Sequence, residues 1–150
     1  ASALFSGCHS TPVAMTDRAP AVTPSIRSIS DVVNRQVKEP TAFTSPSGNV
    51  RCYLDTTTAR CDISERSWAP PLRPASCAFD YGHGITLRQG RPAEFICAGG
   101  DTPRASTQLG DRDSITAGAL RCESAATGIT CRDTKTQHGF VLSREAYHLF

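Results

Sequence analysis

The sequence has no long apolar run and no cluster of charges of one sign. No stretch of about 18 apolar residues occurs in it, so we expect no segment of it to cross a bilayer as a helix. The 16 basic and 14 acidic side chains are spread along the chain, for a net charge of +2, whereas nucleic-acid-binding proteins normally show a clustered basic face. We therefore expect no nucleic-acid partner.

Common catalytic and cofactor-binding motifs are also missing. The sequence contains no G-x-S-x-G nucleophile elbow, no H-E-x-x-H zinc helix, no Walker loop and no Rossmann glycine fingerprint. Its cysteines do not occur in the close pairs that zinc modules use. We therefore expect no metal and no cofactor, and these absences favour a non-catalytic protein over an enzyme.

The residues that are abundant favour turns and short strands. The 150 residues include 10 prolines and 11 glycines, which favour turns and loops over long helices. A chain of this length fits one domain with a tail. Short apolar segments punctuated by Gly and Pro predict a mainly β fold: a small antiparallel sheet or barrel of disulfide-linked hairpins with short helical additions. The expected strands are 41–45, 84–88, 93–97, 114–116 and 139–143, and the expected helical turns are 64–68 and 143–147.

Seven cysteines indicate disulfides in an oxidising compartment outside the cytoplasm. Two segments repeat the pattern G-x-[apolar]-R-C, followed by eight residues and a second cysteine. Eight intervening residues allow two cysteines to face each other across a β-hairpin, where opposed Cβ atoms lie about 4.5 to 5.5 Å apart. We expect the two hairpins to occupy related positions in one sheet or small barrel. Loop closure and the repeat favour three pairs: Cys52 with Cys61, Cys122 with Cys131 and, from the remainder, Cys77 with Cys97.

Residues 1–8 resemble the end of an export signal. Residues 4–8, Leu-Phe-Ser-Gly-Cys, are similar to a bacterial lipobox, in which the cysteine is acylated. Residues 1–3, Ala-Ser-Ala, offer a competing site where an ordinary signal peptidase could cut, which would leave Cys8 as a spare thiol. Both interpretations place the protein outside the cytoplasm. Because an unpaired exposed thiol is unfavourable there, we favour a lipid on Cys8 that anchors the protein to the outer face of the cytoplasmic membrane or to the cell envelope.

The region between Cys8 and the body divides into two parts. Residues 9–25 are rich in Thr, Pro, Ala and Ser, which is the composition of a flexible tether. In residues 26–39 the apolar side chains recur at spacings of three and four, which predicts a short amphipathic helix ended by Pro40. This helix could pack on the domain or dock a partner. The disulfide-linked β-rich domain then covers residues 41–150.

The body also resembles a known family. The matching segments are 43–52 (Phe-Thr-Ser-Pro-Ser-Gly-Asn-Val-Arg-Cys), 59–63 (Ala-Arg-Cys-Asp-Ile), Trp68, 100–102 and the last thirteen residues from His138. Together they are similar to a domain of unknown function in exported mycobacterial and other actinobacterial proteins. The resemblance covers about residues 41–150. It implies secretion or lipoprotein anchoring, and it implies no known activity.

Four residues are candidates for binding or acid–base chemistry. His83 and His138 lie beside glycines, as titratable side chains of functional loops often do. Asp101 follows two glycines, and Trp68 precedes Ala-Pro-Pro and could anchor a partner. Each also has an ordinary structural interpretation: an exposed or backbone-bonded loop histidine, a turn aspartate, and a core or lid aromatic.

The leading hypothesis is an exported cell-envelope lipoprotein that acts as a non-catalytic binding or structural accessory module for another envelope protein or complex. One alternative is an enzyme with an unfamiliar histidine-based site, such as a hydrolase using His138 and an acidic neighbour. The other is a small-ligand carrier, which needs an apolar pocket of roughly 300 Å³ or more. An aromatic content of 7% and three cystines in the interior argue against such a pocket.

Overall fold

The computed structural model describes residues 7, 31–97, 102–105 and 107–150, and the regular structure of these residues is all β. The mainly β prediction is confirmed, and all five strands predicted individually are present, with their ends displaced by at most three residues. The strands are β1 (Asn34–Gln36), β2 (Thr41–Thr44), β3 (Val50–Leu54), β4 (Thr58–Ile63), β5 (Tyr81–Arg88), β6 (Glu94–Cys97), β7 (Ser114–Ala117), β8 (Leu120–Ala125), β9 (Gly128–Asp133), β10 (Gly139–Leu142) and β11 (Tyr147–Leu149).

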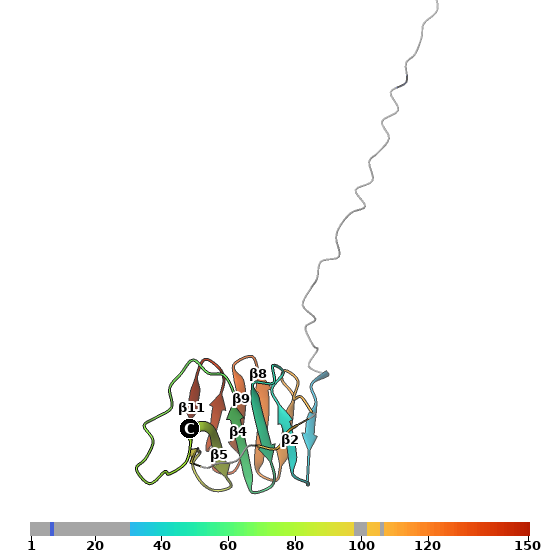
Figure 1. Cartoon of the computed structure of the whole chain (residues 1–150). Helices are drawn as coiled ribbons and strands as arrows, with labels where there is room; N and C mark the ends of the chain where they lie inside the picture. The colour runs from blue at the N-terminus through green and yellow to red at the C-terminus, as the bar shows by residue number, and fades with distance from the viewer. Residues whose placement is uncertain (1–6, 8–30, 98–101, 106) are drawn as a thin grey trace, which may run out of the picture.

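These strands form two sheets (Figure 1). Strands β2 to β6 form a five-stranded antiparallel sheet in chain order, and β7 to β11 follow one another in the same way. Strand β1 adds to β7 in parallel, which makes the second sheet mixed and six-stranded. The two repeated hairpins, β3–β4 and β8–β9, therefore lie in different sheets, and the expectation that they share one sheet is wrong. Each sheet has one apolar face, and the two apolar faces cover each other.

The two halves of the domain, the meanders β2–β6 and β7–β11, exchange the segments that precede them in the chain. Strand β1, which comes before the first meander, pairs with β7 of the second. Residues 107–109, which come before the second meander, pair in parallel with β2 of the first: Thr44 donates its N–H to the Thr107 carbonyl (2.9 Å) and accepts from Leu109 N–H (2.8 Å). One edge of each sheet is thereby covered by chain from the other half, which protects it from unwanted pairing.

The repeated cysteines lie directly opposite each other in their hairpins. Cys52 pairs with Cys61 and Cys122 with Cys131, each with a Cα–Cα distance of 4.1 Å, and the third disulfide joins Cys77 to Cys97 at 5.7 Å. All three predicted disulfides are confirmed. They indicate that the protein matures in an oxidising location outside the cytoplasm.

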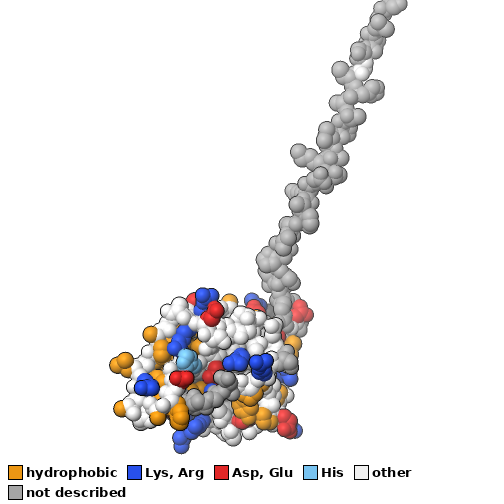
Figure 2. Space-filling view, viewed as in Figure 1, with side chains coloured by type: hydrophobic (Ala, Val, Ile, Leu, Met, Phe, Trp, Pro, Cys, Tyr) orange, Lys and Arg blue, Asp and Glu red, His pale blue; other side chains and the backbone are white. Residues whose placement is uncertain are grey.

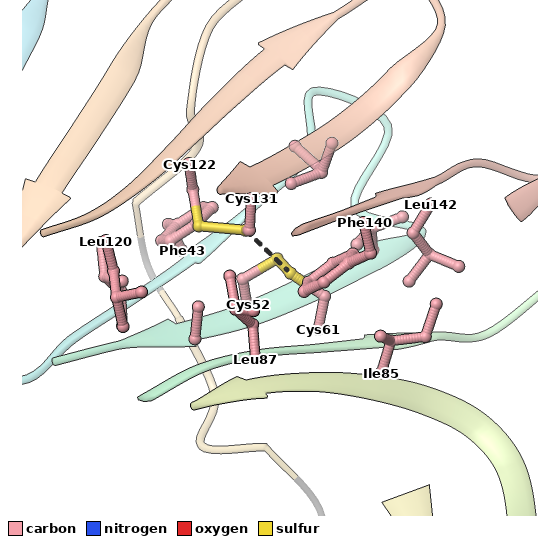
Figure 3. Close-up of a cluster of buried hydrophobic side chains, with 14 of the residues drawn as sticks. Phe43, Cys52, Cys61, Ile85, Leu87, Leu120, Cys122, Cys131, Phe140 and Leu142 are labelled. Atoms are coloured by element: carbon pink, nitrogen blue, oxygen red, sulfur yellow. Dashed lines mark hydrogen bonds between the residues drawn. A yellow bond between two sulfur atoms is a disulfide. The ribbon is translucent and has the colours of Figure 1, made fainter. Parts of the chain in front are cut away.

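The two hairpin disulfides form the centre of the core (Figure 3). Their four cysteines are fully buried, and the sulfur atoms of Cys61 and Cys131 lie 3.9 Å apart. Both sulfurs belong to disulfides and carry no hydrogen, so this is a van der Waals contact between the sheets. Phe43 and Phe140, also fully buried, are the largest side chains around them. The space between the sheets is thus filled by sulfur and hydrocarbon.

The structure corrects the predicted helices. Part of the helix predicted for 26–39 is strand β1, because the open edge of β7 supplies backbone partners: Ser114 N–H donates to the Val33 carbonyl (2.9 Å) and Val37 N–H to the Thr116 carbonyl (2.9 Å). Residues 26–30 lie outside the described part of the chain, as do Cys8 and the predicted tether at 9–25. Apolar spacing was a weaker constraint here than pairing with a distant strand.

The two short helical turns are also wrong. Residues 64–68 run as an irregular segment because their polar groups bond to neighbouring loops instead of to one another. At 143–147, Ser143 Oγ accepts the N–H of Ala146 (3.1 Å), the bond that a helix cap would make, but the chain closes the β10–β11 turn and enters β11. No helix capable of crossing a membrane occurs among the described residues.

Candidate functional site

An open cleft lies at one end of the sandwich, between loops of the two sheets, and we call it the end cleft. Its volume is about 530 Å³, within the range of about 300 to 1,000 Å³ of ordinary ligand sites. One wall is the β2–β3 turn, and the other is the tip of the β8–β9 hairpin. Val50 and Leu142, both buried core side chains, reach its floor. The site therefore combines an apolar floor with polar loops.

Comparison of the two repeated hairpins shows that the sandwich is open at the end cleft and closed at the opposite end, which we call the far end. At the far end, the tip of the β3–β4 hairpin meets the β7–β8 turn: a Cβ built on Gly118 would lie 3.6 Å from the Thr56 side chain. The matching elements at the end cleft are the β8–β9 tip, where Ala126 takes the place of Thr56, and the β2–β3 turn, where Gly48 takes the place of Gly118. A Cβ built on Gly48 would have nothing within 4 Å.

The β3–β4 tip, at the closed far end, is also stabilised by hydrogen bonds to the Asp55 side chain. Asp55 Oδ1 accepts hydrogen bonds from the N–H groups of Thr57 and Thr58, both at 2.8 Å, and Oδ2 accepts from the Tyr53 hydroxyl at 2.8 Å. Burial would raise the pKa of Asp55, but these hydrogen bonds outweigh it and hold that pKa below its usual value. The same carboxylate raises the pKa of Tyr53. Ala125 occupies the matching position at the end cleft and can make no such bonds.

The rim of the end cleft carries more negative than positive charge. The side chains of Glu65, Asp111 and Glu145 line it together with one cation, Arg144. Arg144 Nη1 lies 4.0 Å from Glu65 Oε2. Both of these side chains are mostly exposed, so this ion pair contributes little to stability. The rim is therefore suited to a positively charged group.

The wall beside Glu65 is held across the two sheets. Asn49 accepts the N–H of Glu65 through its side-chain oxygen (2.7 Å) and donates to the Glu65 carbonyl through its side-chain nitrogen (2.8 Å). Ser67 N–H donates to the carbonyl of Arg144 at 2.8 Å. Trp68 Nε1 donates to the carbonyl of Ser143 at 2.8 Å. Segment 64–68 thus ties the five-stranded sheet to the β10–β11 turn and fixes the position of this wall.

Trp68 belongs to an aromatic cluster behind that wall. Its ring lies 4.6 Å from the ring of Tyr147 on β11 and 6.1 Å from that of Phe95 on β6, measured between centroids. Arg66 also lies over the Trp68 ring, with its guanidinium carbon 4.9 Å from the ring centre. Strands β6 and β11 are the outer edges of their sheets, so the cluster closes the side of the sandwich. This contact set gives Trp68 a structural role, with its ring half-buried.

The two candidate histidines lie at different places. His83 is exposed on β5 and lines a shallow hollow next to the end cleft, which shares Glu65 and Arg144 with it. His138 precedes β10 at the far end, where its carbonyl accepts the N–H of Asp133 at 2.8 Å. The structure therefore does not bring the two rings into one site. Asp101 and Cys8 lie outside the described residues.

Asp133 is a buried carboxylate that sequence reasoning missed. Its side chain is fully buried at the far end and accepts N–H groups from Gly90 (2.8 Å), Lys135 (2.9 Å) and Thr136 (3.3 Å). Burial would raise the pKa of Asp133, but these hydrogen bonds outweigh it and hold that pKa below its usual value. Asp133 joins the β5–β6 turn to the loop after β9. The sequence Asp-Thr-Lys-Thr is a turn signal of this kind.

The long loop between β4 and β5 projects from the body (Figure 1) and presents apolar side chains to solvent. Leu72 is 95% exposed and Phe79 is 61% exposed. The disulfide from Cys77 to Cys97 ties this loop to the end of β6. On the face shown in Figure 2, acidic and basic side chains are interspersed and do not gather into a patch of one sign. No group of three or more His, Cys, Asp or Glu side chains in the described ranges is placed to hold a metal ion.

Comparison with known proteins gives no relative from which a function could be transferred. No protein-family model, no curated protein and no solved structure gives a significant match to the chain. The resemblance to an exported actinobacterial domain therefore stays a prediction. Any functional proposal has to depend on the site itself.

Proposed function

We propose that this protein is a non-catalytic binding module of the cell envelope, held at the membrane by a lipid on Cys8, that receives part of an envelope partner in the end cleft. The observation that carries the proposal is the asymmetry between the two ends of the sandwich. The Thr56 tip closes the far end, while the Ala126 tip leaves about 530 Å³ open. The disulfide-linked core keeps this shape without a ligand, which reduces the ordering cost of binding.

The chemistry of the cleft supports a partner of one kind. Three carboxylates and one guanidinium line the rim, and Val50 and Leu142 form an apolar floor. A protein segment that inserts an apolar side chain and carries a Lys or Arg beside it matches both features. Such a segment would bury hydrocarbon on the floor, at about 25 cal/mol per Å² of apolar surface, while its cation faces the acidic rim.

The separation of the titratable candidates supports a binding role over a hydrolytic one. A general base has to lie within hydrogen-bond reach of the group it activates. His83 lines a hollow beside the end cleft, and the main-chain carbonyl of His138 bonds at the far end. The hydrolase alternative, in which His138 acts with an acidic neighbour, gains no support from this placement. The carrier alternative needs an apolar pocket of roughly 300 Å³ or more. The end cleft exceeds that volume, but it is open to solvent and has a charged rim, which suits a protein segment better than an apolar small molecule.

Site-specific photocrosslinking in intact cell envelopes tests the cleft. A benzophenone amino acid at Pro46, which is exposed on one wall, should give a discrete protein adduct. Ala126→Trp fills the cleft from the opposite wall and should abolish the adduct. Gln89→Trp, in the turn at the far end, is the matched control and should leave the adduct unchanged. An adduct that survives Ala126→Trp, or one that Gln89→Trp also removes, would disprove the site.

The lipid anchor is tested separately. Cys8 has no assigned cystine partner, because the other six cysteines pair with one another. Cys8→Ser should therefore release a folded protein into the aqueous fraction, whereas the wild type should partition into detergent, since two or three acyl chains anchor stably. Equal partitioning of the two proteins, or loss of folding in Cys8→Ser, would show that Cys8 has a structural role instead.

A further inference from the structure

Two arginines lie directly opposite each other on the outer face of the six-stranded sheet. Arg121 on β8 pairs in register with Arg132 on β9. Both are neighbours of core cysteines, Cys122 and Cys131, so both side chains point to the outer face. Like charges directly opposite in an antiparallel pair destabilise it. The sheet thus tolerates a repulsive pair at its centre.

The same positions in the other half hold a complementary pair. The residues that match Arg121 and Arg132 in the repeat are Arg51 and Asp62, which are opposite each other on β3 and β4. Asp62 also accepts two hydrogen bonds from Arg60, at 3.1 and 3.2 Å, and one from the Thr102 hydroxyl. A carboxylate belonging to the chain therefore lies among the cations of the five-stranded sheet. The fold accepts an aspartate at this position, so it does not require the second arginine.

The two arginines contact different partners. Arg121 Nη1 lies 2.6 Å from Glu123 Oε2 on the same strand. Arg132 has no carboxylate within ion-pair distance among the described residues, and its guanidinium carbon lies 5.5 Å from the centre of the Phe150 ring. A guanidinium that contacts a ring through its flat face keeps the N–H groups on its edge for another acceptor.

The space around the pair is a hollow lined by further polar groups. Its volume is about 310 Å³, and besides the two arginines it is lined by Thr130, Thr134 and Gln137. Glu123, the ion-pair partner of Arg121 and the register partner of Thr130, also lines it, so the hollow has two cations and one carboxylate. Gln137 adopts a φ of 66°, in the left-handed region that non-glycine residues rarely adopt, and such strain is often found at functional sites. Guanidinium and hydroxyl donors around one hollow match the oxygens of a phosphate.

We propose that Arg121 and Arg132 bind a phosphate-sized oxyanion in this hollow. The oxyanion takes the place that Asp62 fills in the other half of the molecule and offsets the repulsion between the two guanidinium groups. The proposal is independent of the end cleft, because it uses the outer face of a sheet and different residues.

Binding can be measured with inorganic phosphate. In the wild type, sodium phosphate should raise the melting temperature above that in sodium chloride of equal ionic strength, and it should shift the backbone amide signals of Arg121, Thr130, Arg132 and Gln137. Arg132→Gln should weaken the apparent affinity by about tenfold or more, as expected for loss of a hydrogen bond to a charged group. Arg88→Gln removes an exposed arginine from the outer face of the other sheet and should bind phosphate as the wild type does.

Arg132→Asp separates binding from folding. This substitution gives β8 and β9 the same Arg–Asp pair that Arg51 and Asp62 form on β3 and β4. It should therefore abolish the phosphate response without lowering the melting temperature in phosphate-free buffer. If phosphate and chloride stabilise the wild type equally, or if Arg132→Gln and Arg88→Gln respond alike, the proposal is wrong.

Vesicles identify the source of the oxyanion once the phosphate response is established. Binding to phosphatidylglycerol vesicles that phosphate competes away, with none to phosphatidylcholine vesicles, would assign a lipid headgroup. A phosphate response without vesicle binding would assign a free phosphate or phosphoester. Either result is compatible with the site, whereas vesicle binding that Arg132→Gln leaves intact would overturn it.

Discussion

Replacing Asp133 by Asn changes one buried carboxylate with little change in volume. In the wild type, Oδ2 accepts the N–H of Gly90 at 2.8 Å, while Oδ1 accepts those of Lys135 and Thr136. The Asn side chain keeps one oxygen, but its NH₂ group takes the place of Oδ2 and faces the N–H of Gly90, which is also a donor. Since a hydrogen bond to a charged group contributes about 1.5 to 3 kcal/mol, and a buried unpaired donor adds a cost of its own, we expect a loss of about 2 to 3 kcal/mol. At about 2 to 4 °C per kcal/mol, this corresponds to a melting temperature roughly 4 to 12 °C lower at pH 7.

The pH dependence identifies the cause. The pKa of Asp133 is lower in the folded state than its usual value, so its contribution to stability is present above the unfolded-state pKa of about 3.9 and is lost as pH falls through the folded-state pKa. The difference between wild type and Asp133→Asn should therefore be constant from neutrality down to about pH 5 and shrink in stronger acid. Asp80→Asn, which changes an exposed aspartate, is the control. Equal melting temperatures at pH 7, or a difference that does not shrink in acid, would refute the reasoning.

Three other predictions concern the framework. Cys97 is exposed whereas the four hairpin cysteines are fully buried, so mild reductant followed by alkylation and mass spectrometry should show Cys77–Cys97 opening first; earlier labelling of the hairpin cysteines would contradict this. Gly139→Ala should destabilise more than Gly90→Ala in urea unfolding, because a Cβ on Gly139 would lie 2.3 Å from the Cys131 carbonyl oxygen. Gly90→Ala meets no neighbouring atom and has only the cost of a left-handed φ of 79°; equal midpoints would count against the prediction. Because the halves exchange their first segments, fragments 31–105 and 106–150 should each give the circular dichroism of an unfolded chain when alone; a folded fragment would show that the exchange is dispensable.

The sequence predicted the parts of the fold that depend on local constraints. Eight residues between two cysteines, with a repeat of the same pattern, were enough to predict both hairpins and all three disulfides. Strands β1 and β11 were not predicted, because their backbone partners come from distant segments and their local signals favoured helix. A periodic pattern records which side chains can share a face, but pairing with a distant edge decides which structure forms.

The two candidate surfaces differ in how much of each could be predicted from the sequence. Arg121 and Arg132 flank the paired cysteines, so their opposition follows once the β8–β9 hairpin is accepted, and it could have been predicted. The end cleft could not, because it depends on how far the Ala126 tip stands from the β2–β3 turn, which comes from another sheet. The histidines beside glycines were the visible signals, and the structure does not bring them together.

At three equivalent positions the two halves of the domain carry different residues, and the differences follow one pattern. Thr56 closes the far end where Ala126 leaves the end cleft open. Asp62 places a carboxylate where Arg132 places a second cation. Asp133 bonds the loops of the far end together, while its counterpart near the end cleft is the apolar Ile63. In each pair, one half has a residue that closes a loop contact or neutralises a charge, which shows that the fold accommodates such a residue at that position. The fold therefore does not require the different residue found in the other half. The residues that leave the end cleft open, and Arg132, which lacks the carboxylate that its counterpart Asp62 provides, are therefore the positions where the two binding proposals should be tested first.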